Sequence, residues 1–188
     1  MKMKLVLASK SPRRKEILQN NGYSFVAVES KFGENDIALH PIETAVSNAL
    51  GKATSVFNEL NDENVVVLGA DTIVYFNQTI LGKPKDKNDA IEMLKTLSNA
   101  THTVVTGYAV ISGKGCVSGH TESKVTFNDL SLELINQYVN SGLPLDKAGA
   151  YGIQDPYPLV QGYKGSLSNI IGLPIEDIKP ILDKQLNG

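Results

Sequence analysis

A strand, a turn and a helix are encoded in residues 5–18, which read LVLASKSPRRKEIL. The apolar start predicts a short strand over residues 4–8, and the small polar residues after it predict a turn. Ser11 is a favourable N-cap because its hydroxyl accepts a free backbone N–H, and Pro12 suits the first helical position. The pattern therefore predicts a helix over residues 12–20, ended by Gly22, that begins close to the end of a strand.

Basic side chains crowd the first turn of this helix. Arg13, Arg14 and Lys15 stand where the helix dipole already presents positive charge, at a cost of roughly 0.3–1 kcal/mol per charge. A bound anion would remove that cost, and free N–H groups, the hydroxyls of Ser9 and Ser11 and two guanidiniums suit phosphate. The alternative is a solvated basic helix end.

The composition is that of a globular protein of moderate size. The 188 residues are 41% hydrophobic and 20% charged, which allows one domain or two compact lobes. The net charge of −2 argues against a general nucleic-acid-binding protein, because non-specific affinity comes mainly from phosphate neutralisation. We therefore expect no nucleic-acid partner, although basic residues can still cluster around a small phosphate ligand.

Cysteine, histidine and hydropathy argue against further classes. Cys116 is the single cysteine, which fits a reducing compartment. His40, His102 and His120 are far apart and lack the spacing of a zinc site. The N-terminal apolar run is too short for a signal peptide, and no run approaches the roughly 18 residues that span a bilayer. We expect a cytoplasmic protein without a membrane partner.

Helical and strand-like patterns are intermixed along the chain. The strand-like segments are residues 4–8, 23–28, 65–70, 73–76, 79–81, 101–112 and 116–127. The helical segments are residues 12–20, 41–60, 89–97, 131–139 and 174–186, and Pro180 kinks or interrupts the last of them. Residues 30–39 read as a polar loop and residues 140–172 mostly as loop and short strand. These elements predict an α/β fold with a mixed twisted sheet, flanking helices and a ligand cleft between two lobes.

Asp71 is the strongest catalytic candidate by position. The buried apolar run ends at Ala70, so this carboxylate is expected directly after a rigid strand, where α/β folds tend to bind ligands. Ser9 follows its own strand in a similar way. Asp71 can bind Mg²⁺, orient a water molecule or accept its proton. The alternative is a carboxylate that caps a turn or bonds to Thr72.

Two lysines are candidates for phosphate binding. Lys83 lies in a Leu-Gly-Lys-Pro loop, where glycine permits close approach and proline limits the conformations. Lys52 lies beside Ala49 and Ala53, close to the apolar face of its predicted helix. Each has a simpler interpretation, Lys83 as a surface lysine and Lys52 as a side chain that snorkels to solvent.

Residues 145–154 are dense in small side chains, as backbone packed against a ligand is. Gln154 carries both a donor and an acceptor and can bond to the edge of a base. The alternative is a structural turn with Asp146 and Lys147 paired on its surface. Small polar side chains over residues 165–169 line the same cleft or cap the following turn.

These motifs together resemble the Maf-like nucleoside triphosphate pyrophosphatases, also called septum-formation proteins. The resemblance begins with the signature at residues 7–18 and continues through residues 51–53, 69–74, 81–84, 146–154 and 165–174, in the family's order. It covers essentially the whole chain. It implies a single Maf-like domain over residues 1–188 with a fold of the Maf/ITPase type.

The resemblance implies a cytoplasmic, often dimeric enzyme that hydrolyses nucleoside triphosphates between the α and β phosphates. The products would be a nucleoside monophosphate and pyrophosphate, and a divalent metal would be required, Mg²⁺ or alternatively Mn²⁺. The run 150–154, together with Arg13 and Thr72, resembles the subgroup that acts on dTTP and UTP rather than on 7-methyl-GTP. We expect Asp71 and Lys83 to be catalytic. The expected substrate-binding residues are Ser9, Ser11, Arg13, Arg14, Lys52, Thr72 and Gln154.

Two positions depart from the family's pattern. The family usually has an acidic pair after the second strand, one member of which helps to bind metal, and an ungapped alignment places Lys31 there. A short insertion brings Glu34 to that position, and Glu29 is a weaker alternative, so we expect the metal ligands to be Asp71 and Glu34. The second departure is Asp155, where the family commonly has glycine. An inward-facing carboxylate there would alter base recognition or repel a phosphate.

Two functions from different classes follow. The first is metal-assisted hydrolysis of dTTP and UTP, serving the removal of non-standard nucleotides or septum formation. The alternative is a nucleotide-binding regulator of cell division without hydrolytic activity. The joint presence of Asp71, Lys83 and both arginines favours the enzyme, because a sensor needs to bind phosphate but needs no water-activating carboxylate.

Overall fold

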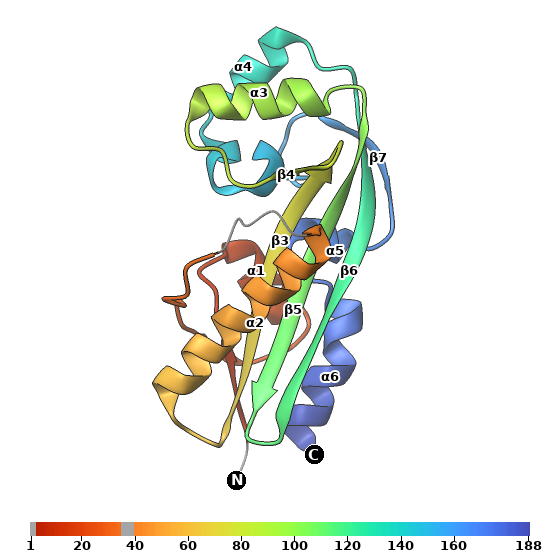
Figure 1. The fold of residues 1–188 in the computed structure, drawn as a ribbon. Helices are drawn as coiled ribbons and strands as arrows, with labels where there is room; N and C mark the ends of the chain where they lie inside the picture. Colours follow the sequence, from red (N-terminus) through yellow and green to blue (C-terminus); the bar gives the residue numbers. More distant parts are fainter. Residues whose placement is uncertain (1–2, 35–39) are drawn as a thin grey trace.

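A mixed sheet with helices on both faces forms the protein in a computed structural model that describes residues 3–34 and 40–188 (Figure 1). The strands are β1 (Lys4–Leu7), β2 (Phe25–Ala27), β3 (Val65–Phe76), β4 (Thr79–Leu81), β5 (Thr101–Ser112), β6 (Gly115–Phe127) and β7 (Val160–Lys164). The helices are α1 (Pro12–Asn20), α2 (Pro41–Leu60), α3 (Lys87–Leu97), α4 (Leu132–Asn140), α5 (Leu167–Ile171) and α6 (Ile175–Asn187), with short 3₁₀ turns η1 (Leu143–Asp146) and η2 (Ala148–Ala150). The predicted α/β class with a mixed sheet is confirmed.

Strand β3 is the axis of the seven-stranded sheet, whose order is β2-β1-β3-β5-β6-β7 with β4 paired to β3. One edge of β3 pairs antiparallel with β5 over residues 66–75. The other edge is divided, because β1 pairs in parallel with residues 65–68 and β4 pairs antiparallel with residues 74–76. Within the described part of the chain, no strand pairs with this edge at residues 69–73. The sheet therefore has a gap between β1 and β4.

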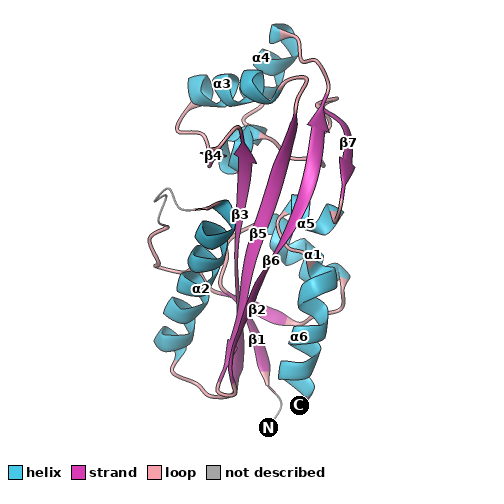
Figure 2. Ribbon diagram, turned by 45° about the vertical axis from the view of Figure 1, so that its right-hand side comes forward, coloured by secondary structure: helices cyan, strands magenta, loops and turns pink. Residues whose placement is uncertain are grey.

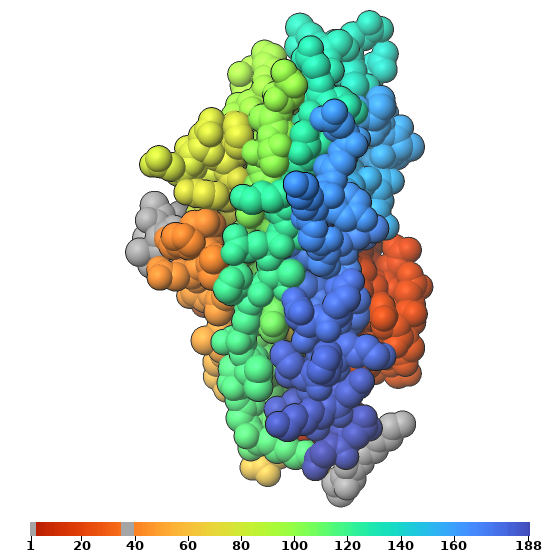
Figure 3. Space-filling view, turned by 90° about the vertical axis from the view of Figure 1, so that its right-hand side faces the viewer, coloured from red at the N-terminus to blue at the C-terminus, as the bar shows by residue number. Residues whose placement is uncertain are grey.

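The strands β3, β5 and β6 run the length of the molecule and connect two lobes (Figures 1 and 2). In the lobe that holds both termini, α2 packs on one face of the sheet, and α1 and α6 pack on the other. In the other lobe, α3 and α4 enclose a separate core with the far ends of β3, β5 and β6. The space-filling view shows α6 beside β6 (Figure 3), where Thr121 donates a hydrogen bond to Asp177.

Helix α2 lies close against the sheet because glycines face it. Ala45 and Ala49 are fully buried in the helix face that the sequence predicted. A Cβ added at Gly107 would overlap the backbone of Ala45, and one added at Gly69 would overlap the backbone of Ala49. Asp71 pairs with Gly107 across β3 and β5, so its side chain faces the same helix.

The structure corrects the predicted end of the third strand. We expected Ala70 to end one strand and a second to begin at residue 73, but β3 is continuous from Val65 to Phe76. The physical reason is the neighbouring strand, because β5 pairs with both polar residues, Thr106 with Thr72 and Gly107 with Asp71. Asp71 therefore lies inside a strand, beyond the last residue of β3 that pairs with β1.

Other boundaries differ less. Strand β2 is shorter than the predicted segment 23–28, and the short helix α5, capped by Ser166, lies where mostly loop was expected. Helix α6 continues through Pro180 without interruption. Ser11 caps its helix as predicted, and its hydroxyl accepts from the backbone N–H of Arg14; Ser131 caps α4 in the same way by accepting from Leu134. Residues 35–39 of the predicted loop 30–39 lie outside the described residues. In the described ranges, no helix is long and apolar enough to cross a membrane.

The packing of α2 leads to a stability prediction. Gly107→Ala is expected to lower the free energy of unfolding by about 1–3 kcal/mol, because the added methyl group overlaps backbone that moves only with the whole helix. Gly162→Ala in β7 is the matched control, since a Cβ there meets nothing within 4 Å. Urea unfolding measures both. A Gly107→Ala protein with the wild-type midpoint would contradict the close approach of α2.

Candidate active site

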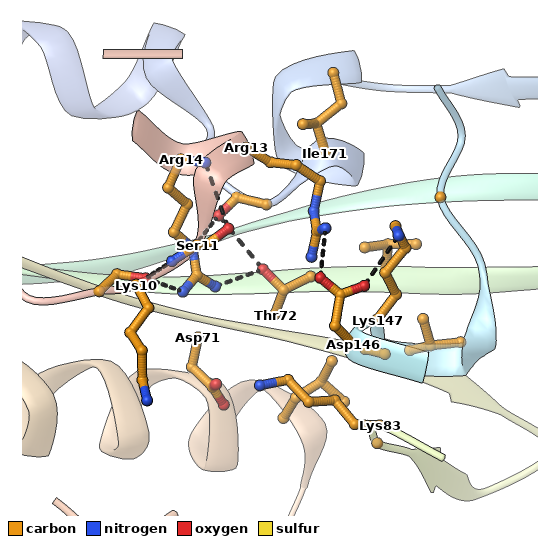
Figure 4. A pocket seen from close by; sticks show the side chains of 18 of the residues that line it. Lys10, Ser11, Arg13, Arg14, Asp71, Thr72, Lys83, Asp146, Lys147 and Ile171 are labelled. Atoms are coloured by element: carbon orange, nitrogen blue, oxygen red, sulfur yellow. Dashed lines mark hydrogen bonds and ion pairs between the residues drawn. The ribbon is translucent and has the colours of Figure 1, made fainter. Parts of the chain in front are cut away.

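A cleft of about 530 Å³ opens at the unpaired edge of β3, between the two lobes (Figure 4). Its walls come from the β1–α1 turn, from α2, from β3 and β4, and from the segment 146–155. Every site residue predicted from the sequence lines it: Ser9, Ser11, Arg13, Arg14, Glu34, Lys52, Asp71, Thr72, Lys83 and Gln154. Segments far apart in the sequence thus bring both carboxylates and all predicted cationic groups to one cavity.

Both carboxylate oxygens of Asp71 are held by side chains of helix α2. The side chain is 7% exposed, its Oδ1 accepts from Lys52 Nζ at 2.8 Å, and its Oδ2 accepts from Asn48 Nδ2 at 3.0 Å. The two donors stand four residues apart, so they occupy one face of the helix. Sequence reasoning missed Asn48. Its one available signal was a polar side chain four positions before Lys52 on an otherwise alanine-rich face.

Lys52 joins the two predicted metal ligands. Its Nζ lies 2.8 Å from Asp71 Oδ1 and 2.7 Å from Glu34 Oε1. Burial acts to raise the pKa of Glu34, but the hydrogen bond and charge of Lys52 outweigh it, together with the charges of Lys83 and Arg14. The pKa of Glu34 therefore lies below its usual value, and the carboxylate is ionised at neutral pH.

Three residues could occupy the family's second acidic position, and their ion-pair partners distinguish them. Lys31 forms an ion pair with Glu59 at 3.0 Å, and Glu29 forms one with Lys10. Glu34 instead shares the cation of Asp71, which favours it as the second acidic group. Among the residues the structure describes, no three His, Cys, Asp or Glu side chains are grouped to hold a metal. Two carboxylates suit Mg²⁺ nonetheless, because proteins often bind that ion through one or two carboxylates plus substrate phosphates and water.

Arg14 is held in place by three acceptors. Its Nη1 donates to Ser9 Oγ at 3.2 Å, its Nη2 to Thr72 Oγ1 at 3.1 Å, and its Nε to the Gly172 carbonyl at 2.8 Å. Burial lowers the pKa of Arg14, and the charge of Asp71 acts against that change. The three bonds leave one N–H on each terminal nitrogen for a ligand.

Arg13 crosses the cleft to the other lobe. Its Nη1 lies 3.2 Å from Asp146 Oδ2, and Asp146 Oδ1 lies 3.0 Å from Lys147 Nζ (Figure 4). The pairing of Asp146 with Lys147 that the sequence suggested is present, but Lys147 is only 8% exposed. The pair therefore combines a buried Lys147 with an Asp146 side chain that is 60% exposed, and both residues line the cleft.

Lys83 and Gln154 belong to the α3–α4 lobe. Lys83 is exposed in the loop after β4, and its amine points toward Asp71 (Figure 4). Gln154 is exposed and lines both the main cleft and an adjoining crevice of about 160 Å³. Lys83 therefore reaches the cleft beside Asp71. Gln154 instead lies next to α1, because Arg13 and Glu16 of that helix line the same crevice.

Asp155 lines the cleft, but its charge is compensated within its own lobe. Its Oδ2 accepts from the Tyr138 hydroxyl at 2.5 Å and lies 3.7 Å from Lys147 Nζ. Burial and this hydrogen bond raise the pKa of Tyr138, so the phenol stays protonated and continues to donate. The partners of Asp155 reduce the repulsion of phosphate that an uncompensated carboxylate would cause.

A buried aromatic cluster supports the segment before Gln154. The Tyr151 hydroxyl lies 2.8 Å from His102 Nε2, and both rings pack edge-on to Phe127. His102 is 1% exposed, and burial lowers its pKa to about 4. It is therefore neutral in the folded protein at pH 7.

The neutral His102 predicts a loss of stability in acid. Unfolded His102 takes up a proton near pH 6.5 and folded His102 near pH 4, so the unfolded state binds more protons between these values. The free energy of unfolding falls as the pH drops through this window, by up to about 1.4 kcal/mol per pH unit from this group. Urea unfolding of the wild type and of His102→Gln measures it. The stability advantage of the wild type is expected to shrink from pH 7 to pH 4, and a constant difference would contradict burial of a neutral imidazole.

Comparison with known proteins shows which family the chain resembles over its length. The chain matches the Maf-like protein family over residues 4–185. The dTTP/UTP pyrophosphatase of Aquifex aeolicus is 44% identical over 186 residues, which cover 98% of this chain and 96% of that protein. The dTTP/UTP pyrophosphatase of Desulfitobacterium hafniense is 46% identical over 182 residues, which cover 93% and 82%.

The chain therefore belongs to the Maf family. Among solved structures, a nucleoside-triphosphatase, dITP/XTP pyrophosphatase, from Mycobacterium abscessus aligns with 98% of this chain and 95% of its own, with a TM-score of 0.46 and 15% identity.

Proposed function

We propose that this protein hydrolyses nucleoside triphosphates, with dTTP and UTP preferred, to the nucleoside monophosphate and pyrophosphate. The observation that carries the proposal is a carboxylate, Asp71, held in one orientation within a cleft that Arg14, Arg13 and Lys83 also line. The dTTP/UTP pyrophosphatases that are 44% and 46% identical to the chain support the same reaction.

Asp71 is the group that we assign to the attacking water. The water oxygen forms a bond to the α-phosphorus while the bond from that phosphorus to the oxygen bridging the β phosphate breaks. The water's proton passes to Asp71 and then to solvent, and pyrophosphate leaves with the bridging oxygen. Lys52 and Asn48 keep the carboxylate oriented, so little reorganisation precedes the attack.

The cationic groups hold the triphosphate and offset the charge that grows on the leaving pyrophosphate. Arg14 has one free N–H on each terminal nitrogen, and Ser9 and Ser11 stand at the start of α1, where the helix dipole favours anions. Lys83 contributes an exposed ammonium directed toward Asp71, and we assign it as a catalytic residue that contacts the phosphates. Arg13 binds phosphate through N–H groups that Asp146 does not occupy.

Asp71 and Glu34 are the residues that we propose to hold a divalent cation, Mg²⁺ or in its place Mn²⁺. When bound, the ion would polarise the phosphate oxygens and help to neutralise their charge. Both carboxylates already share one cationic partner in Lys52, so their position is compatible with a common cation. The ionised state of Glu34 at neutral pH suits this role.

Base preference is assigned to Gln154 and Thr72. Gln154 is exposed in the cleft and offers a donor and an acceptor to a base edge. The Thr72 hydroxyl bonds to Arg14 and Thr106, so a base contact of Thr72 stays a prediction. A single domain over residues 1–188, a homodimer, a cytoplasmic location and a role in nucleotide house-cleaning or septum formation stay predictions as well.

Pyrophosphate release from dTTP, UTP, CTP, dGTP and 7-methyl-GTP, with Mg²⁺ and with EDTA, tests the proposed function. Metal-dependent release that is fastest with dTTP or UTP is the expected result. Release from 7-methyl-GTP alone would contradict the pyrimidine preference. Nucleotide binding without release from any substrate would contradict hydrolysis and favour the regulator of cell division.

Replacement of the Asp71 carboxylate by an amide tests whether this residue acts in the hydrolysis step and not in nucleotide binding. Asp71→Asn is expected to lower kcat by about two orders of magnitude or more, because the proton acceptor is lost while the side-chain shape remains. Binding of dTTP, measured by calorimetry, should persist. Asp129→Asn, the same change at an exposed residue outside the cleft, is the matched control. An Asp71→Asn protein with near-normal kcat would remove Asp71 from the mechanism.

Gln154 carries a prediction about base selection. Gln154→Ala is expected to lower the ratio of kcat/KM for dTTP to that for dGTP by about tenfold, as expected for the loss of hydrogen bonds to a base. Gln137→Ala, an exposed glutamine on α4 outside the cleft, is the control. An unchanged dTTP/dGTP ratio in Gln154→Ala would exclude base reading by this side chain.

A further inference from the structure

A line of hydrogen bonds leads from Arg14 into the interior of the sheet. Arg14 Nη2 lies 3.1 Å from Thr72 Oγ1, and Thr72 Oγ1 lies 2.9 Å from Thr106 Oγ1. Thr106 Oγ1 in turn lies 3.1 Å from the backbone carbonyl of Asn169. The two threonines are direct partners across β3 and β5, so their side chains share the face on which α1 and α5 lie.

The direction of this chain follows from counting hydrogens. A carbonyl only accepts, so the single hydroxyl hydrogen of Thr106 goes to Asn169. Thr106 Oγ1 therefore presents a lone pair to Thr72, and the Thr72 hydroxyl donates to it at 2.9 Å rather than to the more distant Gly172 carbonyl at 3.4 Å. A lone pair of Thr72 Oγ1 is then left to accept from Arg14. Thr106 thus decides which way the Thr72 hydroxyl points.

The far end of the chain is rigid. Asn169 is fully buried in α5, and its Nδ2 donates to the Val104 carbonyl at 3.2 Å and to Ser123 Oγ at 2.9 Å. These bonds tie α5 to β5 and β6, so the Asn169 carbonyl is a fixed acceptor. Thr106 is also fully buried and does not line the cleft, so it has no direct contact with a ligand there.

We propose that Thr106 is a positioning residue that holds Arg14 in its phosphate-binding orientation by fixing the hydroxyl of Thr72. The inference rests on the proposed function, because it assigns to Arg14 the binding of the substrate's phosphates. It adds a residue to the site that lies one strand behind the cleft wall.

Without the Thr106 hydroxyl, the Thr72 hydrogen has one alternative acceptor nearby, the Gly172 carbonyl at 3.4 Å. That carbonyl already accepts from Arg14 Nε at 2.8 Å. Rotation of the Thr72 hydroxyl toward Gly172 would bring a second donor to the oxygen that holds Arg14. The guanidinium would then lose orientation at Thr72 and at Gly172 together.

The test compares Thr106→Val, which keeps the shape and removes the hydroxyl, with Thr106→Ser, which keeps the hydroxyl. Inorganic tripolyphosphate is the probe, and calorimetry gives its dissociation constant without any turnover. Thr106→Val is expected to weaken tripolyphosphate binding about three- to tenfold, the range for loss of one hydrogen bond. KM for dTTP should rise by a similar factor while kcat changes less than about twofold, and Thr106→Ser should stay within about twofold of the wild type.

Thr103→Val is the matched control. Thr103 is a buried threonine of the same strand that does not line the cleft, and its hydroxyl accepts from Lys124. Its replacement should leave tripolyphosphate affinity unchanged. Circular dichroism and thermal unfolding of all variants verify that each is folded. If Thr106→Val does not fold, Thr106→Ala, which also removes the hydroxyl, takes its place with the same expected loss of tripolyphosphate affinity.

A double-mutant cycle decides whether Thr106 acts through Arg14. In an Arg14→Ala background, Thr106→Val is expected to cause no further loss of tripolyphosphate affinity. Wild-type affinity in Thr106→Val, equal losses in Thr106→Ser and Thr106→Val, or a full additional loss in the Arg14→Ala background would each overturn the inference. A wild-type protein that does not bind tripolyphosphate would instead overturn the phosphate site, and with it the proposed function.

Discussion

The divided edge of β3 is the constraint on which the rest of the structure depends. Two strands pair with this edge, β1 near its start and β4 near its end, and residues 69–73 between them are left without a strand partner in the described chain. The opposite edge is paired with β5 over residues 66–75, so the strand is continuous through the gap. An unpaired edge in the middle of a sheet is open to a ligand, and here it forms the floor of the cleft.

The gap makes both faces of β3 accessible from one cavity. Successive side chains of a strand point to opposite faces, so Asp71 faces α2 while Thr72 faces α1 and α5. In a fully paired sheet these two residues would belong to separate cores. At the gap both residues line the same cleft. Asp71 lies with Glu34 around Lys52, and Thr72 bonds to Arg14.

Several charged groups in the cleft are paired with one another. Lys52 lies between Asp71 and Glu34, and Arg13 is paired with Asp146. The side chains of Lys52 and Asp71 are each 11% exposed, and charges so far removed from water need such partners, because an unpaired buried charge is strongly destabilising. Binding of a triphosphate would therefore replace existing partners of the cations with phosphate oxygens. The existing pairs keep the cations ordered, but the gain in binding free energy is smaller than unpaired cations would give.

Local sequence determined much of the fold and most of the candidate site. The strand, cap and basic helix of residues 4–20, the alanine face of α2 and the β5–β6 hairpin all follow from periodicity and turn chemistry within short windows. A polar residue after an apolar run singled out Asp71, and the basic first turn of the predicted helix singled out Arg14, and both line the cleft. What only the tertiary structure decided is the continuity of β3 through Asp71 and the roles of Asn48, Thr106 and Asp146. These depend on β5, α2 and η1 lying beside β3 and α1, and contacts between segments so distant in the chain leave no periodic signal in the sequence of either partner.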